Sequence, residues 1–261
     1  MQIKKSILPL LLAELVGTVL LLTIGLSIVI FFWGTGSPVP HIITNEGLRR
    51  AVTGFLFGTT GCLITLSKVG RISGAHINPA VSIAFWLHGK MKTQAMLGYI
   101  ISQMLGAAIG CIGLLLWGKQ GKSVQYGTTV PGSSGLLVAF VGEMLTTAAL
   151  ITIIFVFAGK KRLRHLTPFT IPFLYCLMVW LEAPYSGCST NPARSFGPAF
   201  ISNSYTAYWL YWIAPIAGVL IVVGIFRGLE LHRYYQIEAA RVGHHNSPTH
   251  ESIKTTDPKV L

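Results

Sequence analysis

One eight-residue frame occurs twice in this sequence. SGAHINPA occupies residues 73–80 and SGCSTNPA occupies residues 186–193, so Ser-Gly and Asn-Pro-Ala recur with the same spacing. Each copy leads into a short apolar segment, roughly 78–88 and 191–202. At 1.5 Å per residue, a helix of that length covers about 16–18 Å, roughly half of the hydrocarbon core of a bilayer. These segments can enter a membrane but cannot cross it.

Six longer apolar runs surround the short segments. A helix that spans a bilayer needs about 20 residues, and only the fifth run is short for this purpose. Hydrophobic residues make up 52% of the chain and charged residues only 11%, whereas soluble domains carry about 25% charged residues. The sequence predicts an all-α membrane protein with six transmembrane helices and two re-entrant half-helices. The predicted spans are 8–33, 49–67, 93–117, 136–158, 168–183 and 207–228.

The two halves of the chain follow the same order of elements. AELVGT at 13–18 resembles GEMLTT at 142–147, and each places a glutamate early in an apolar run. Each half then reads as a span with a glutamate, a second span, a short segment and a third span. Three spans are an odd number, so the second half must enter from the opposite face, as inverted repeats do. We expect a channel-type domain over 1–228, with repeat one at 1–117 and repeat two at 136–228, followed by a polar cytoplasmic tail at 229–261.

The distribution of lysine and arginine predicts the orientation. If the N-terminus is inside, only five of the 20 basic residues fall outside, namely Arg49, Arg50, Lys119, Lys122 and Arg194. This bias is typical of proteins whose termini are both cytoplasmic, here in a plasma or inner membrane. The basic residues interrupt apolar runs instead of forming one basic face. The net charge of +12 therefore indicates contact with a lipid bilayer, and nucleic-acid binding is not expected.

The Asn-Pro-Ala triplet explains how each short helix begins. Asparagine is a favoured N-cap and proline a favoured first helical residue. The two helices would begin at midplane with their positive ends facing each other, which repels cations and hydronium. Each asparagine can also donate N–H groups to a passing oxygen and interrupt a proton-conducting chain of water. The six pore residues are Asn78, Pro79, Ala80, Asn191, Pro192 and Ala193.

The residues before each cap must be non-helical at membrane depth. Such backbone is tolerated only where it is buried in protein or lines a water-filled cavity. We expect extended backbone whose carbonyl groups line a file of water. The residues concerned are Gly74, Ala75 and His76 in the first copy, and Gly187, Cys188 and Ser189 in the second.

Three charged residues in the apolar segments require a reason to be there. Arg194 follows the second triplet, where the first copy has Val81, and it is interpreted as an outer pore constriction. Glu14 and Glu143, the only carboxylates deep in apolar spans, are expected to accept hydrogen bonds from backbone N–H groups of the re-entrant loops. A proton relay is the alternative for these two residues.

Catalysis is not indicated by the spans. They contain no Ser/His/Asp set, no metal-ligand cluster and no phosphate-binding glycine loop, so no enzyme, cofactor or metal is expected. A secondary transporter shares inverted repeats and broken helices. It needs a coupling-ion site, however, and the midplane here offers amides and helix ends instead of free carboxylates.

With these motifs in place, the chain resembles the major intrinsic protein family of aquaporins and aquaglyceroporins over about 8–228. The resemblance is carried by AELVGT, SGAHINPAV, GEMLTT and SGCSTNPARSFGPA. It implies six tilted helices and two half-helices in a right-handed bundle, and a homotetramer with one pore in each subunit.

The resemblance also implies four selectivity-filter positions. Arg194 matches the arginine of the motif, and Cys188 matches the loop position three residues before Asn191. Val179 stands where water-selective members usually have histidine. The fourth position, counted back from the first triplet, is Gly58, and a slip of one residue would make it Phe57, the residue type usual in water-selective members.

Other family positions point toward water. Ser195, Ala199 and the Tyr211-Trp212 pair are typical of the water branch, whereas Val179 and Gly58 imply a wider and less polar opening. We expect a passive channel that conducts water in single file and excludes protons and ions. The alternative is a facilitator of glycerol, urea, ammonia or hydrogen peroxide, and a secondary transporter is a distant third.

Overall fold

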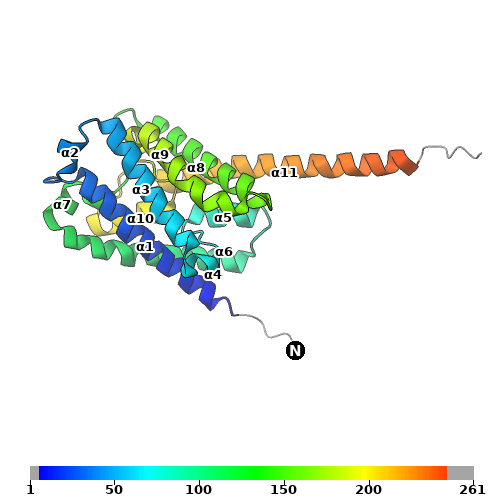
Figure 1. The fold of residues 1–261 in the computed structure, drawn as a ribbon, viewed down its shortest axis with the longest axis horizontal. Coiled ribbons are helices and arrows are strands. Elements are labelled where there is room, and N and C mark those ends of the chain that lie inside the picture. Colours follow the sequence, from blue (N-terminus) through cyan, green and yellow to red (C-terminus); the bar gives the residue numbers. More distant parts are fainter. Residues whose placement is uncertain (1–5, 246–261) are drawn as a thin grey trace, which may run out of the picture. The chain divides into compact units, whose positions relative to one another are not determined.

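The computed structural model of the chain describes residues 6–245, and within that range it contains helices and no strand (Figure 1). The long helices are α1 (Leu8–Trp33), α3 (Glu46–Leu66), α6 (Thr93–Ile112), α8 (Leu136–Gly159), α9 (Thr167–Ser186) and α11 (Leu210–His245). The short ones are α2 (Val39–Ile42), α4 (Lys68–Ser73), α5 (Pro79–Leu87), α7 (Gly118–Ser123) and α10 (Pro192–Ser202). Single 3₁₀ turns are η1 (Gly113–Trp117), η2 (Gln125–Gly127) and η3 (Arg164–Leu166). The all-α architecture expected from the sequence is confirmed.

The chain divides into two compact units, the first ending at Val223 and the second beginning at Gly224. All the elements that carry the repeated frame belong to the first unit. The apolar span in α11 ends at Leu229, next to the predicted end at 228, and the helix itself continues to His245. Residues 246–261 of the predicted tail lie outside the described part of the chain.

Five helices within the described range are long and apolar enough to cross a membrane: Leu8–Trp33, Thr93–Ser123, Leu136–Gly159, Arg164–Ser186 and Leu210–Leu229. The second predicted span corresponds to α3, whose 21 residues begin with Glu46 and include two arginines in the first turns, so its mean hydropathy is lower. The sixth span begins at 210 and not at 207, because Ala207 has a left-handed φ of 48° in the turn before α11.

Glycines let the long helices approach closely. A Cβ atom at Gly58 would lie 2.8 Å from the Cα of Pro172, and one at Gly54 would collide with α9 as well. A Cβ atom at Gly110 would lie 2.7 Å from the carbonyl oxygen of Val19. Thus α3 packs against α9 and α6 packs against α1 with little more than backbone between them, as small residues allow in lipid.

The same helix contacts recur in the two halves of the chain. In repeat one α1 packs along α6. In repeat two the beginning of α11 packs on α8, with Ala139, Leu210, Tyr211 and Ala214 fully buried together. The two repeats join through α3 and α9, the second long helix of each half.

The two half-helices lie within this frame. With nine and eleven residues, α5 and α10 are about 14 and 17 Å long. The helix α5 contacts α6 and α8, α10 contacts α6 and η2, and the two contact each other. Neither is long enough to cross a membrane.

Candidate functional site

Each half-helix begins at the asparagine of its triplet. Asn78 has extended dihedral angles, and its Oδ1 accepts a hydrogen bond from the N–H of Ala80 at 2.8 Å. Asn191 Oδ1 accepts from the N–H groups of Ala193 and Arg194, at 3.0 and 3.3 Å. Pro79 and Pro192 are the first helical residues. The local chemistry of Asn-Pro thus starts both helices in the same way.

The two asparagines also hold each other's loops. Asn78 Nδ2 donates to the carbonyl of Thr190, and Asn191 Nδ2 donates to the carbonyl of Ile77, both at 2.9 Å. The two half-helices therefore meet at their N-terminal ends. A side-chain amide has two N–H groups, so each asparagine keeps a second one beyond this link. Both asparagines line the same cavity of about 340 Å³, where that group can donate to a passing molecule.

A buried glutamate supports each re-entrant loop. The Glu14 carboxylate accepts from the N–H groups of His76 and Ile77, at 2.9 and 2.7 Å. The Glu143 carboxylate accepts from the N–H groups of Ser189 and Thr190, at 2.6 and 2.8 Å. Both glutamates are fully buried. Two matched pairs of backbone donors are satisfied by these two side chains.

The loop backbone differs from the extended form expected from the sequence. Left-handed φ values occur at Gly74, Ala75 and Ile77 in the first loop, and at Gly187, Cys188 and Thr190 in the second. Successive N–H groups can converge on one anion in such a backbone, and the glutamates occupy those positions. Because the C=O of a trans peptide points opposite to its N–H, the carbonyls of Ala75, His76, Cys188 and Ser189 point away from the glutamates.

Matched hydroxyl contacts surround both loops. Tyr99 Oη donates to the carbonyl of Ser73 at 2.8 Å, and Tyr211 Oη donates to the carbonyl of Ser186 at 2.7 Å. These serines open the two repeated frames. The sequence offered no signal for Tyr99, because a single tyrosine in an apolar run is normally a core residue.

Two cavities lie along the loops, and we call them outer and inner after the orientation that the basic residues predict. The outer one, of about 250 Å³, is lined by Val179, Gly187, Cys188 and Arg194 among others. The inner one, of about 340 Å³, is lined by Gly74 to Asn78, together with Asn191. Phe57 and Tyr175 line both cavities and therefore stand where the two meet. The sequence gives no signal for Tyr175, whose hydroxyl forms a hydrogen bond with the hydroxyl of Thr190 at 2.8 Å.

Arg194 and Phe57 lie close together at this meeting point. The guanidinium carbon of Arg194 is 5.9 Å from the centre of the Phe57 ring. Its Nη1 donates to the carbonyl of Gly127 at 2.6 Å, and the side chain is buried. Gly58 is among the residues around the inner cavity, but its Cβ position faces the backbone of α9. Of the two alternatives in α3, Phe57 is the one beside the arginine.

The structure buries a third carboxylate besides Glu14 and Glu143, the two expected from the sequence. Only 7% of the surface of Glu182 is exposed. It faces Gly142 of α8. Glu182 lies near the C-terminal end of the fifth apolar run, where the sequence predicts the membrane interface. Its burial results from the packing of α8 on α9.

Comparisons with known proteins agree with this geometry. The family model described as major intrinsic protein matches residues 2–226. Aquaporin TIP2-3 of Arabidopsis thaliana is 30% identical over 224 residues, which cover 83% of this chain and 88% of that protein. Aquaporin Z of Photorhabdus laumondii is 30% identical over 227 residues, which cover 82% of this chain and 94% of that protein.

A solved structure shares the fold. The X-ray structure of the aquaglyceroporin from Plasmodium falciparum matches with a TM-score of 0.69 and 22% identity, covering 85% of this chain and 96% of that one. A family match over most of the chain, relatives at this level of identity, and the two facing half-helices all lead to one conclusion. The chain belongs to the major intrinsic protein family and is a multi-pass integral membrane protein.

Proposed function

We propose that this protein is a passive channel that conducts water in single file and excludes protons and ions. The observation that carries the proposal is the meeting of two capped half-helices at Asn78 and Asn191 beside two cavities. The relatives named as aquaporins favour the same solute.

Proton exclusion follows from the arrangement at the centre. Two helix N-termini that face each other place about +0.5 charge each beside the path. The free N–H group of each asparagine donates to the oxygen of a central water, so the hydrogens of that water point outward on both sides. A chain of waters with opposite orientations cannot pass a proton along. Carbonyl groups of the two loops supply acceptors on the way to the centre.

We propose Phe57, Val179, Cys188 and Arg194 as the selectivity filter, with Gly58 as a packing residue of α3. The first three side chains and Arg194 line the outer cavity. The loop carbonyls of Gly74, Ala75, His76, Gly187 and Ser189 are proposed as pore-lining acceptors, and Glu14 and Glu143 as the supports of their loops.

The test is osmotic swelling of proteoliposomes that contain the purified protein. We expect fast swelling when the external osmolarity is lowered, with a proton permeability no higher than that of empty vesicles. A measurable proton current, together with water permeability equal to that of empty vesicles, would reject the proposal.

Passage of small neutral solutes is the second candidate function, and Val179 favours it. Valine offers no hydrogen bond at this point of the cavity wall and is smaller than histidine. Val179→His is expected to narrow the opening and to reduce glycerol and urea flux several-fold more than water flux. Stopped-flow measurements of the three permeabilities check this, and an unchanged ratio would show that Val179 does not line the filter.

The assembly and placement of the protein are further proposals. We propose a homotetramer with one pore per subunit in a plasma or inner membrane, with both termini cytoplasmic. The bias of lysine and arginine toward one side supports the orientation. The family likeness supports the tetramer. No enzymatic activity is proposed, because the features that the site presents are amides, carbonyls and a constriction.

A further inference from the structure

The outer cavity carries an excess of positive charge. Its lining includes two guanidinium groups, those of Arg50 and Arg194, and, within the described part of the chain, no carboxylate. The other walls are largely apolar and include Val29, Phe57 and Val179. A cavity of about 250 Å³ with this lining presents two charged hydrogen-bond donors to whatever enters it.

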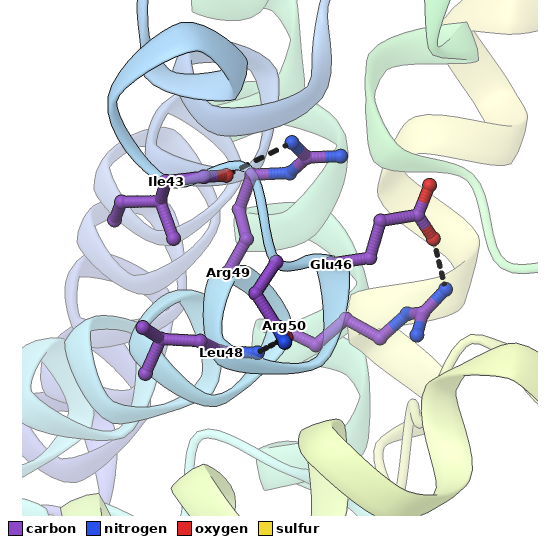
Figure 2. A network of polar contacts seen from close by, with 6 residues as sticks. Ile43, Glu46, Leu48, Arg49 and Arg50 are labelled. Carbon is purple, nitrogen blue, oxygen red and sulfur yellow. Dashed lines mark hydrogen bonds and ion pairs between the residues drawn. The ribbon is translucent and has the colours of Figure 1, made fainter.

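One exposed carboxylate, Glu46, offsets part of this charge. Arg50 pairs with Glu46 at 2.8 Å, but the Glu46 side chain is 61% exposed, so water screens the pair. Figure 2 shows Arg50 turned toward Glu46 and Arg49 turned toward the carbonyl of Ile43. Among residues 6–245, Glu46 is thus the only acidic partner for two adjacent arginines.

Arg49 adds a third cation to the same place. It is 8% exposed, its Nη1 donates to the Ile43 carbonyl at 3.3 Å, and its buried Nε has no partner among the described residues. Its guanidinium carbon lies 4.2 Å from the centre of the Trp33 ring, and that of Arg50 lies 5.7 Å from the same ring. Trp33 itself lines the outer cavity. Stacking on an aromatic face stabilises a cation but does not neutralise it.

We propose that the outer cavity binds a small monovalent anion, such as a short carboxylate, through the guanidinium groups of Arg50 and Arg194. Two guanidinium groups line this cavity without a carboxylate among its lining residues, so its electrostatic potential favours a bound anion. Guanidinium groups bind carboxylates through strong charge-assisted hydrogen bonds. The apolar walls suit a carboxylate with a short hydrocarbon tail.

A bound anion would block the path and not traverse it. Beyond Arg194 the path runs past Phe57 and Tyr175, which line both cavities and pack against each other with their ring centres 5.8 Å apart. To enter there, an anion would leave its water shell and both arginines. We therefore expect an occupied outer cavity to reduce water flow. This effect rests on the proposed function, whereas binding itself does not.

Binding can be measured without conduction, because Trp33 is a fluorescent reporter in the cavity wall. Iodide is the probe, and the purified full-length protein is titrated at constant ionic strength with fluoride, a strongly hydrated anion that is not a carboxylate, as the replacement. We expect a saturable component of quenching that disappears in Trp33→Phe and is displaced by acetate or benzoate. Arg50→Gln should weaken the apparent iodide affinity about tenfold, and Glu46→Gln should strengthen it, because Arg50 is then unpaired.

Lys122→Gln is the matched control. It removes one positive charge from an exposed site outside the cavity lining and should leave the affinity within about twofold. Quenching that rises linearly without saturation, or equal weakening in the Arg50 and Lys122 variants, would overturn the site.

Water permeability of proteoliposomes with acetate on both sides tests the block. A fall in water permeability that follows the binding curve of the fluorescence titration supports the block. Unchanged water permeability at saturating acetate rejects the block. If the protein conducted no water in fluoride medium without a carboxylate, the proposed function would fail while the fluorescence titration would still decide the anion site.

Discussion

Glu143→Gln is expected to destabilise the protein by about 3 kcal/mol or more and to abolish most of its water permeability. The carboxylate accepts three hydrogen bonds, from the hydroxyl of Ser186 at 2.7 Å and from the backbone N–H groups of Ser189 and Thr190 at 2.6 and 2.8 Å. An amide of the same shape replaces one acceptor oxygen with an NH₂ group. A buried backbone N–H then faces another donor, at a cost of about 1–3 kcal/mol.

The remaining loss comes from the charge. Hydrogen bonds to a charged acceptor contribute about 1.5–3 kcal/mol each, and neutral ones about half as much. Glu14→Gln should behave similarly, because its carboxylate accepts from His76, Ile77 and the Gln103 side chain at 2.7–2.9 Å. The measurements are the unfolding midpoint in mixed micelles and the swelling rate per reconstituted protein.

Glu46→Gln is the control for these variants. It breaks an exposed i,i+4 ion pair, which contributes at most about 1 kcal/mol. Equal midpoints for the Glu46 and Glu143 variants would show that the buried carboxylate does not hold the loop.

Arg194→Val is expected to raise the permeability to monovalent cations and protons by at least tenfold while water still passes. Valine is the residue at the matching position of the first frame, Val81. Two unit charges about 4 Å apart repel each other by about 4 kcal/mol at an effective dielectric constant of 20. Losing this barrier would raise the cation permeability by a factor of about 10³. The positive ends of α5 and α10 remain, so we expect a smaller increase.

The wider opening should also admit urea and glycerol more readily, because the guanidinium group no longer lies beside Phe57. Arg194→Lys is the matched control, since it retains the charge and should keep cation permeability low. Fluorescent measurement of vesicle pH, paired with stopped-flow swelling, separates the two effects. If the proton permeability of the Arg194→Val variant equals that of the parent protein, the prediction is wrong and the asparagines alone form the barrier.

Local chemistry made the half-helices predictable from the sequence. Asn-Pro starts a helix wherever it occurs, so the first residues of α5 and α10 follow from the triplets alone. Spans of the right length and a glutamate in each half were equally visible. These features depend on composition and on neighbours within a few positions of the chain.

Features that depend on packing between distant segments were not predictable. Counting from the triplet indicated Gly58, but one residue turns a helix by about 100°, and only the contact of α3 with α9 shows which side chain faces the cavity. The left-handed loop residues follow from the converging bonds to Glu14 and Glu143. The burial of Glu182 depends on Gly142, which is 40 positions earlier in the chain.

The reciprocal amide links have a consequence for how the protein is made. Asn78 and its acceptor on Thr190 are 112 residues apart. At a synthesis rate of about 5–20 residues per second, the first half-helix exists for roughly 6–22 s before that acceptor leaves the ribosome. Glu14 precedes its loop in the chain and can hold the N–H groups of His76 and Ile77 during this interval. The centre of the pathway is then assembled last, when the second half of the polypeptide inserts, so a nascent chain interrupted before Thr190 contains no finished conduit.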